Sequence, residues 1–160
     1  MPPHTPITIR RARAGEAAAL TALALRSKAA HGYDAAFMAQ CVPELTVPPE
    51  RIATGEVWVA EDGVGGIAGY FEIAREGEAA EVLAMFVEPG RFGRGIGRAL
   101  WQKLEERARA TGAHIISVDS DPHALGFYRR CGCIDRGERP SGSIAGRMLP
   151  YLEKPLDQRA

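Results

Sequence analysis

The sequence predicts a single mixed α/β (α+β) domain with a twisted, mostly antiparallel sheet. Three features support this prediction: strand-like runs joined by short turns, helical repeats on either side of them, and one strand–loop–helix–strand unit over residues 81–119. Hairpin-linked strands pair antiparallel, and only the last unit requires a parallel pair. A chain of 160 residues can bury a core without disulfides or a metal, so residues 1–160 are expected to form one domain.

The first elements are a strand and two helices. Residues 7–11 alternate as in a strand, and residues 16–30 carry Leu20, Leu23 and Ser27 at helical spacing. Residues 33–41 predict a second helix that stops before Pro43, because proline disrupts a helix interior. Residues 46–55 contain two prolines and are interpreted as a connection.

The middle of the chain predicts three strands. VWVAED and GIAGYFEIA are joined through DGVGG, which has the glycine and aspartate typical of a hairpin turn. The next run, EVLAMFV, alternates so that Glu81, Leu83, Met85 and Val87 are expected to share one face of the sheet.

The last third begins with a helix over residues 96–112, whose apolar side chains recur every four residues. HIISVDS is the next strand, and DPHALGFYRRCG is a short helix with Asp121 and Pro122 at its start. CIDRGE and AGRMLPYLEK predict two closing strands. We therefore expect about six to seven strands flanked by about four helices.

Composition excludes several classes of partner. Twenty basic and twenty acidic residues cancel, so nothing predicts binding to nucleic acid or to an anionic membrane. No apolar run reaches the roughly 18 residues of a membrane span, and we expect a cytoplasmic protein. Cys41, Cys131 and Cys133 are an odd set expected to stay reduced, and their spacing does not predict a metal site.

Residues 87–101, VEPGRFGRGIGRALW, place three alternate glycines and three arginines between a strand and a helix. Glycines let backbone N–H groups approach an anion, which indicates a phosphate site at the start of the helix. A Walker-type loop is excluded, because Arg98 and Ala99 follow the last glycine in place of Lys and Ser or Thr. A dinucleotide fingerprint has different glycine spacing and belongs to the first strand of a parallel sheet.

The stretch VEPGRFGRGIGRAL resembles the acyl-CoA-binding motif of the GNAT superfamily of N-acyltransferases. That motif is Arg or Gln, two residues, Gly, one residue, then Gly or Ala, and Gly95 and Gly97 match its small positions. Phe92 stands where the family has Arg or Gln, and either Arg91 or Arg94 is expected to supply the cation.

A second segment strengthens the resemblance. DPHALGFYRRCG is similar to the family's Asn-, Ala- and Tyr-containing segment: Ala124, Tyr128 and Gly132 match, Asp121 stands at the Asn position and Cys133 at an aromatic one. The two motifs occur in the family's order within residues 81–133. They imply a GNAT-like N-acetyltransferase that uses acetyl-CoA as acyl donor and no metal.

The resemblance also implies roles for individual residues. Direct attack of a primary amine on the thioester needs a base for the amine, a donor for the oxyanion and an acid for the thiolate. Tyr128 is expected to be the acid and Glu81 the base, with Glu72, His31, His114 and His123 as alternatives. The residues expected to bind acetyl-CoA are Met85, Phe86, Val87, Phe92, Gly93, Arg94, Gly95, Ile96, Gly97, Arg98, Asp121, Ala124 and Phe127.

The acceptor is left open between a small amine and a protein amino group. RPSGS, with Arg139 and Arg147 nearby, is either a substrate-binding segment or a plain turn. A non-catalytic acyl-CoA-binding module and a nucleotide-binding protein are the rival interpretations. A homodimer is expected, through the first helices or the closing strands, with MLPYLEK treated as an edge strand interrupted by Pro150.

Overall fold

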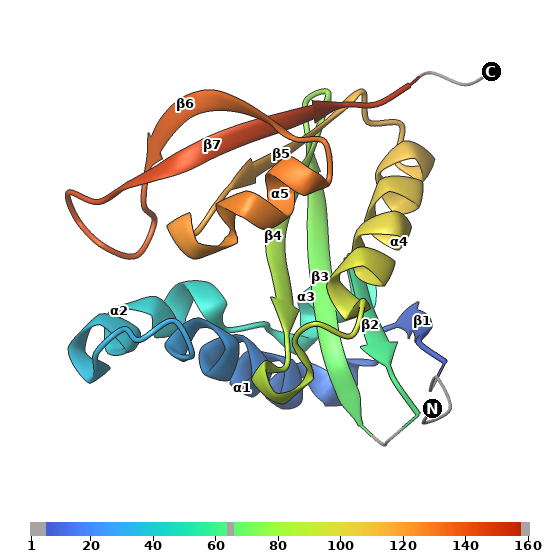
Figure 1. Cartoon of the computed structure of the whole chain (residues 1–160). Coiled ribbons are helices and arrows are strands. Elements are labelled where there is room, and N and C mark those ends of the chain that lie inside the picture. The colour runs from blue at the N-terminus through green and yellow to red at the C-terminus, as the bar shows by residue number, and fades with distance from the viewer. Residues whose placement is uncertain (1–5, 64–65, 158–160) are drawn as a thin grey trace.

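A seven-stranded sheet forms the centre of the computed structural model, which describes residues 6–63 and 66–157. Its strand order is β1-β2-β3-β4-β5-β7-β6 (Figure 1). The strands are β1 Thr8–Arg11, β2 Glu56–Glu61, β3 Ile67–Glu76, β4 Ala79–Val87, β5 Ile115–Asp119, β6 Ile134–Pro140 and β7 Met148–Pro155. Only β4 and β5 pair in parallel, which confirms the predicted mixed, mostly antiparallel sheet.

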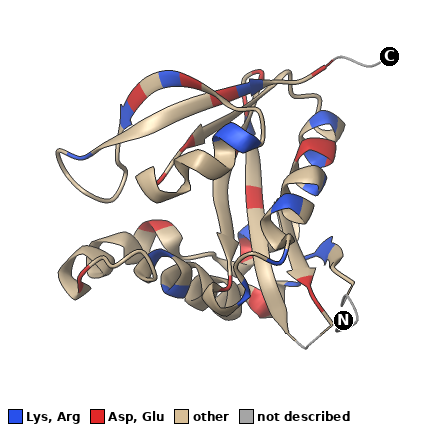
Figure 2. Ribbon diagram, viewed as in Figure 1, with Lys and Arg blue, Asp and Glu red and all other residues tan. Residues whose placement is uncertain are grey.

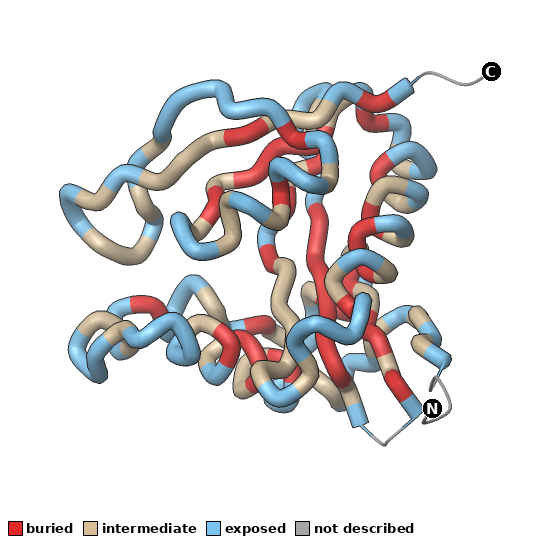
Figure 3. The backbone as a smooth tube through the Cα atoms, viewed as in Figure 1, coloured by how far each residue is buried: buried red, intermediate tan, exposed pale blue. Residues whose placement is uncertain are grey.

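Helices cover both faces of the sheet. They are α1 Ala17–Ala29, α2 Ala35–Leu45, α3 Pro49–Thr54, α4 Ile96–Ala110 and α5 Leu125–Arg130, with short 3-10 turns η1 Ala14–Glu16, η2 Pro89–Arg91 and η3 Pro122–Ala124. One core packs α4 and α5 on the sheet, and a second packs α1 and α3 on the opposite face. Figure 3 shows that the buried residues are concentrated in the middle of the strands and on the sides of the helices that face the sheet.

Two predictions about the first helices are wrong. Helix α2 is capped by Asp34, whose side chain accepts from the N–H of Phe37 at 2.8 Å, and it continues through Pro43 to Leu45. Both Pro43 and Ala39, the residue one turn earlier, are exposed, so water can satisfy the carbonyl that proline leaves without an amide partner. The supposed connection forms α3, because Pro49 occupies a first-turn position and Ile52 is buried.

The alternation predicted for β4 is also wrong beyond its first half. Ile73 pairs with Val82 and Glu72 with Ala84, so Leu83 forms a bulge with no partner in β3. Val82 packs with the α4 core, whereas Ala84 packs with the α1 core. The bulge therefore shifts the alternation by one residue, and Glu81 does not share a face with Met85.

The closing strands pair in an order that the sequence did not indicate. β7 lies between β5 and β6, so MLPYLEK is an interior strand and β6 is the edge. Acidic and basic residues alternate along β6 (Figure 2). No helix in the described part of the chain has the length and apolarity needed to cross a membrane. The predicted turn DGVGG includes residues 64–65, which lie outside the described residues.

Candidate active site

The glycine loop joins β4 to α4 with an unusual backbone. Gly93 and Gly95 have φ values of 79° and 80°, the left-handed region that glycine adopts without strain. Gly95 is the N-cap of α4, and no side chain caps this helix. The first N–H groups of α4 are therefore available to an anion, with the positive end of the helix dipole behind them.

The third glycine has a different role. A Cβ atom on Gly97 would lie 3.1 Å from Cε2 of Phe127, a tight contact that would require the Phe127 ring to move by a few tenths of an ångström. Gly97 therefore permits the first turn of α4 to approach α5. Phe127 in turn packs edge-on against Trp101, with ring centroids 6.3 Å apart.

The cations near the loop are not equivalent. Arg91 forms an ion pair with buried Asp62 at 2.8 Å. Arg91 also lines the cleft beside the loop. Arg98 also lines this cleft, whereas Arg94 is exposed and does not. Phe92 lines it with 52% of its surface exposed. Which arginine replaces the family's cation stays a prediction.

The cleft has a volume of about 920 Å³ and lies between the glycine loop, α4 and α5. Its lining includes these predicted residues: Met85, Val87, Phe92, Gly93, Gly95, Ile96, Gly97, Arg98, Ala124, Phe127 and Tyr128. It also includes residues that the sequence interpretation missed, among them Trp101, Gln102, Arg130 and Cys131. Helical spacing from Gly97 and Arg98 would have indicated Trp101 and Gln102, which lie one turn further along α4.

A divergence of two strands opens the sheet next to this cleft. The parallel pairing of β4 with β5 ends at Val82 and Val118, and the strands separate beyond it (Figure 1). From Leu83 to Val87, β4 has no strand partner on its β5 side within the described chain. This edge can therefore present backbone groups to a bound molecule.

A second, smaller cavity of about 150 Å³ lies on the α1 and α2 side of the divergence. Its walls come from α1, α2, the outer half of β4 and the loop between β6 and β7, and include Lys28, Glu44, Phe86, Asp121 and Arg147. The two cavities share five lining residues, and these are Ser27, His31, Met85, Ala124 and Tyr128. The cavities therefore meet at the divergence of the strands.

Asp121 organises the polar wall of the smaller cavity. Its carboxylate accepts hydrogen bonds from the Tyr33 hydroxyl at 2.8 Å, the Lys28 ammonium at 3.0 Å and the His123 backbone N–H at 2.9 Å. Burial favours the neutral acid, but these donors outweigh it and hold the pKa of Asp121 well below its usual range. Its side chain thus has protein partners, and a role for it in binding acetyl-CoA stays a prediction.

The same cluster anchors the loop between β6 and β7. Arg147 donates to the Tyr33 hydroxyl at 2.8 Å, and the Ser143 hydroxyl donates to the Glu44 carboxylate on α2. These contacts draw the loop over the smaller cavity. The RPSGS segment is therefore more than a plain turn, because Ser141 and Ser143 line the cavity with Arg147.

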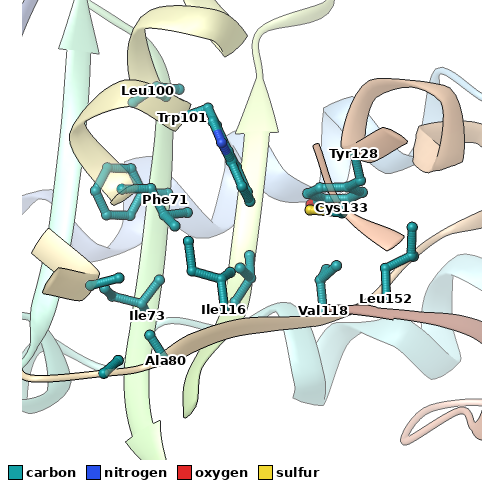
Figure 4. Close-up of a cluster of buried hydrophobic side chains, with 14 of the residues drawn as sticks. Phe71, Ile73, Ala80, Leu100, Trp101, Ile116, Val118, Tyr128, Cys133 and Leu152 are labelled. Carbon is teal, nitrogen blue, oxygen red and sulfur yellow. The ribbon is translucent and has the colours of Figure 1, made fainter. Parts of the chain in front are cut away.

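Tyr128 lies where the cavities meet. It is 5% exposed and packs edge-on against Trp101 and Phe127, with ring centroids 5.9 and 5.3 Å away. Figure 4 shows it next to Cys133 in the buried cluster of the α4 side. Burial raises the pKa of Tyr128, so the phenol stays protonated across the neutral range. Its hydroxyl has no hydrogen-bond partner among the described residues and is free to donate to a ligand.

The candidate carboxylate bases lie away from this junction. Glu72 is buried against Arg51 of α3, 2.5 Å between Nε and Oε2, and lines neither cavity. Glu81 also lines neither cavity, although burial and the neighbouring Glu76 and Asp119 raise its pKa. Its role as base stays a prediction.

The cysteines are free thiols in the described chain. Cys131 lines the larger cleft, and burial raises its pKa to about 11. A thiol of that pKa carries little thiolate at neutral pH, so it is a poor nucleophile or metal ligand. Among the described residues, no group of three or more His, Cys, Asp or Glu side chains has a geometry that could hold a metal ion.

Comparison with known proteins agrees with this geometry. A sequence profile described as "Acetyltransferase (GNAT) domain" matches residues 53–132, half of the chain. The chain belongs to this family of acetyltransferases. The match extends from α3 to the end of α5 and so contains both motifs and the divergence of the strands.

Several relatives share part of the sequence. An "IAA acetyltransferase" of Azospirillum brasilense is 37% identical over 98 residues, which cover 59% of this chain and 60% of that protein. An "L-methionine sulfoximine/L-methionine sulfone acetyltransferase" of Pseudomonas aeruginosa is 34% identical over 63% of this chain and 65% of that protein. The matches thus span less than two thirds of these relatives.

Solved structures share the fold over nearly the whole chain. A GCN5-related N-acetyltransferase from Rhodopseudomonas palustris superposes with a TM-score of 0.77 at 22% identity, covering 96% of this chain and 98% of that one. The PaiA N-acetyltransferase from Thermoplasma acidophilum, in complex with coenzyme A, gives 0.75 at 18% identity and covers 94% and 99%. At such identities these likenesses establish the fold.

Proposed function

We propose that the chain transfers an acetyl group from acetyl-CoA to a primary amine by direct attack. The observation that carries this proposal is the meeting of two cavities at Tyr128, one large and bordered by an uncapped helix start, the other small and polar. The large cleft suits a long ligand with a pyrophosphate. The small one suits an acceptor that must reach the thioester at the end of that ligand.

The donor side would be held mainly by backbone groups. The N–H groups at the start of α4 would bind the pyrophosphate, and Arg98 and Arg130 on the cleft wall would add charge. The free edge of β4 from Met85 to Val87 would hold the pantetheine arm and give an N–H to the carbonyl oxygen of the thioester. Tyr128 would then protonate the departing thiolate.

The acceptor side favours a small amine over a protein amino group. The smaller cavity holds about 150 Å³, and the loop between β6 and β7 is drawn over it by the contacts of Ser143 and Arg147. Basic Lys28 and Arg147 and acidic Glu44 and Asp119 line its walls, which suits an acceptor that carries both charges. The P. aeruginosa relative is named for an amino-acid derivative of this kind.

Two measurements test the proposed function. First, the purified protein is heated with acetyl-CoA, CoA, ATP and NAD in turn, and we expect only the CoA species to raise its melting temperature. Second, free thiol is measured after mixing acetyl-CoA with a panel of amines that includes L-methionine sulfone and glucosamine 6-phosphate. Binding of acetyl-CoA with no transfer to any amine would instead support a non-catalytic acyl-CoA-binding module.

We also propose that the protein is cytoplasmic and forms a homodimer. The β6 edge is a poor surface for pairing, because Gly137 introduces an irregularity and charged side chains flank it. The apolar groove between α1 and α2, lined by Leu25, Ala29, Met38 and Val42, is the better candidate. Light scattering at micromolar concentration would report a dimer, and a monomer with and without acetyl-CoA would contradict this proposal.

A further inference from the structure

His31 occupies the turn after α1, at the place where the two cavities meet. Its backbone N–H closes the turn on the Lys28 carbonyl at 3.1 Å. Its residue lines the larger cleft and the smaller cavity, as Met85 and Tyr128 also do. An imidazole therefore faces the same space as the proposed acid and the free edge of β4.

Stacking holds this imidazole in a defined orientation. The rings of His31 and His123 are parallel within 9°, with centroids 4.6 Å apart. His123 is itself fixed, because its Nδ1 lies 2.9 Å from the Asp121 carboxylate and 3.2 Å from the Tyr33 hydroxyl. Tyr33 also meets the His31 ring edge-on at 6.5 Å. Asp121 thus positions His31 through His123.

The surroundings keep the His31 ring neutral near pH 7. His31 is exposed to solvent on one side, and the burial of the remainder lowers its pKa below the usual value for histidine. The neighbouring His123 and the Lys28 ammonium lower it further, and only the Asp121 carboxylate acts in the opposite direction. Within the described residues, neither ring nitrogen of His31 has a hydrogen-bond partner, so one of them can accept a proton from a ligand.

We propose that His31 is the general base that deprotonates the acceptor ammonium. The carboxylates on the walls of the smaller cavity are less suitable, because each already accepts from the protein. Asp121 accepts from three residues, Asp119 from Arg139 at 2.9 Å, and Glu44 from Ser143. Of the side chains that line both cavities, His31 is the one that can be neutral and accept a proton at pH 7.

The reaction balances with these residues and no further reagent. A His31 nitrogen takes one proton from the ammonium, and the freed nitrogen lone pair attacks the thioester carbon to form the new C–N bond. The tetrahedral adduct collapses with cleavage of the C–S bond, and the thiolate takes the Tyr128 proton. The attacking nitrogen loses its second proton to solvent, and Tyr128 takes up one proton from solvent to restore its hydroxyl. His31 then releases its proton to solvent. The products are the amide, CoA thiol and one proton.

This inference rests on the proposed function, and its test uses the pH profile of His31→Gln with acetyl-CoA and the best acceptor of the amine panel. In the wild type, kcat should reach a plateau above a pKa lower than about 6.5, because His31 takes the proton of the bound ammonium. In His31→Gln, the rate at pH 7 should fall by about 10² to 10³ and then rise with pH toward the pKa of the free amine, near ~10. Exogenous imidazole should restore part of the rate of His31→Ala.

A matched control is His114→Gln, since His114 lines neither cavity in the described chain. It should keep the wild-type plateau. The proposal would be overturned if His31→Gln kept the wild-type plateau of kcat against pH. It would also be overturned if Glu81→Gln lost this plateau while His31→Gln kept the wild-type profile.

An NMR titration of the wild-type histidine rings tests the proposal independently of any acceptor. The His31 resonance should titrate below about 6.5 and shift when CoA is added. A His31 ring that titrates above this value, or that ignores CoA while CoA raises the melting temperature, would overturn it. Absence of transfer by the wild type with every amine would instead contradict the proposed function, and the titration would still decide whether His31 lies at the donor site.

Discussion

The larger cleft, which we propose binds the donor (the donor cleft), and the smaller cavity, which we propose binds the acceptor (the acceptor cavity), are built in different ways, although they meet at Tyr128. The donor cleft takes most of its walls from two short stretches, residues 91–102 and 123–131, and its anion site is backbone at the start of α4. The acceptor cavity collects side chains from α1, α2, β4, β5 and the loop between β6 and β7. Its polar wall depends on contacts between residues as far apart as Tyr33 and Arg147, 114 positions in sequence.

This difference predicts how each region tolerates change. A backbone site survives the replacement of single side chains, which accounts for Phe92 at a position where the family has a cation. A site made of side chains from five elements changes its chemistry whenever one of them changes. We therefore expect donor specificity to be robust and acceptor specificity to be easily altered.

The largest expected effect is that of Tyr128→Phe, which acts at the junction of the two regions. Removing the hydroxyl should lower turnover by about 10² to 10⁴, because the thiolate loses a positioned acid. Acetyl-CoA affinity and melting temperature should stay near wild type, since the ring keeps its packing against Trp101 and Phe127. The measurement is kcat under conditions where chemistry limits the rate. Unchanged turnover would leave Tyr128 as a packing residue.

The donor cleft is tested by Gly95→Val. Gly95 has φ of 80°, which a β-branched residue adopts only with strain, so the N–H groups at the start of α4 should move. Calorimetry should show acetyl-CoA binding weakened by at least about tenfold, more than the few-fold effect expected of Arg98→Ala.

Gly90→Ala is the matched control for the loop. Gly90 has no atom within 4 Å of an added Cβ, and its φ is outside the left-handed region, so binding should stay near wild type. If folded Gly95→Val bound acetyl-CoA more tightly than Arg98→Ala, this reverse ranking would show that the arginines and not the amides hold the phosphates.

The acceptor cavity is tested by Arg147→Met, which keeps most of the side-chain length and removes the charge. The variant should lose the hydrogen bond to Tyr33 and release the loop between β6 and β7. KM for the best amine should rise by about tenfold, while acetyl-CoA affinity changes little. An equal loss of acetyl-CoA affinity would mean that the two regions are not separable.

The smallest expected effect concerns stability and Asp121. Its pKa is depressed in the folded protein, so its carboxylate contributes stability above the unfolded value near ~4, and this contribution is lost as pH falls through the folded pKa. Asp121→Asn should therefore lower the free energy of unfolding at pH 7 by roughly 1 to 3 kcal/mol. Below about pH 4 the difference should narrow. Urea unfolding of the wild type and of Asp121→Asn at pH 7 and pH 3 measures this difference in the free energy of unfolding. A difference that does not change with pH would contradict the predicted contribution of the Asp121 carboxylate.

Much of the fold was predictable from local pattern. The predicted strands, the long α4 and the hairpin-rich sheet are confirmed, because apolar periodicity and turn residues act over a few positions. The wrong predictions concern features that a local sequence pattern does not decide. Pro43 is tolerated inside α2 on an exposed face, and the Leu83 bulge reverses the faces of β4 without any glycine or proline to indicate it.

The sequence by itself determined the features that we propose bind the donor: a glycine loop before a helix, and Tyr128 on α5 one turn after the small residue Ala124. Both depend on backbone conformation and spacing within one segment, which a chain encodes locally. Only the tertiary structure decided the acceptor side. It brings Lys28 to Asp121 across 93 positions, places β7 inside the sheet and makes His31 and Tyr128 line the same two cavities. Such contacts arise from the packing of distant elements, and no local pattern of residues specifies them.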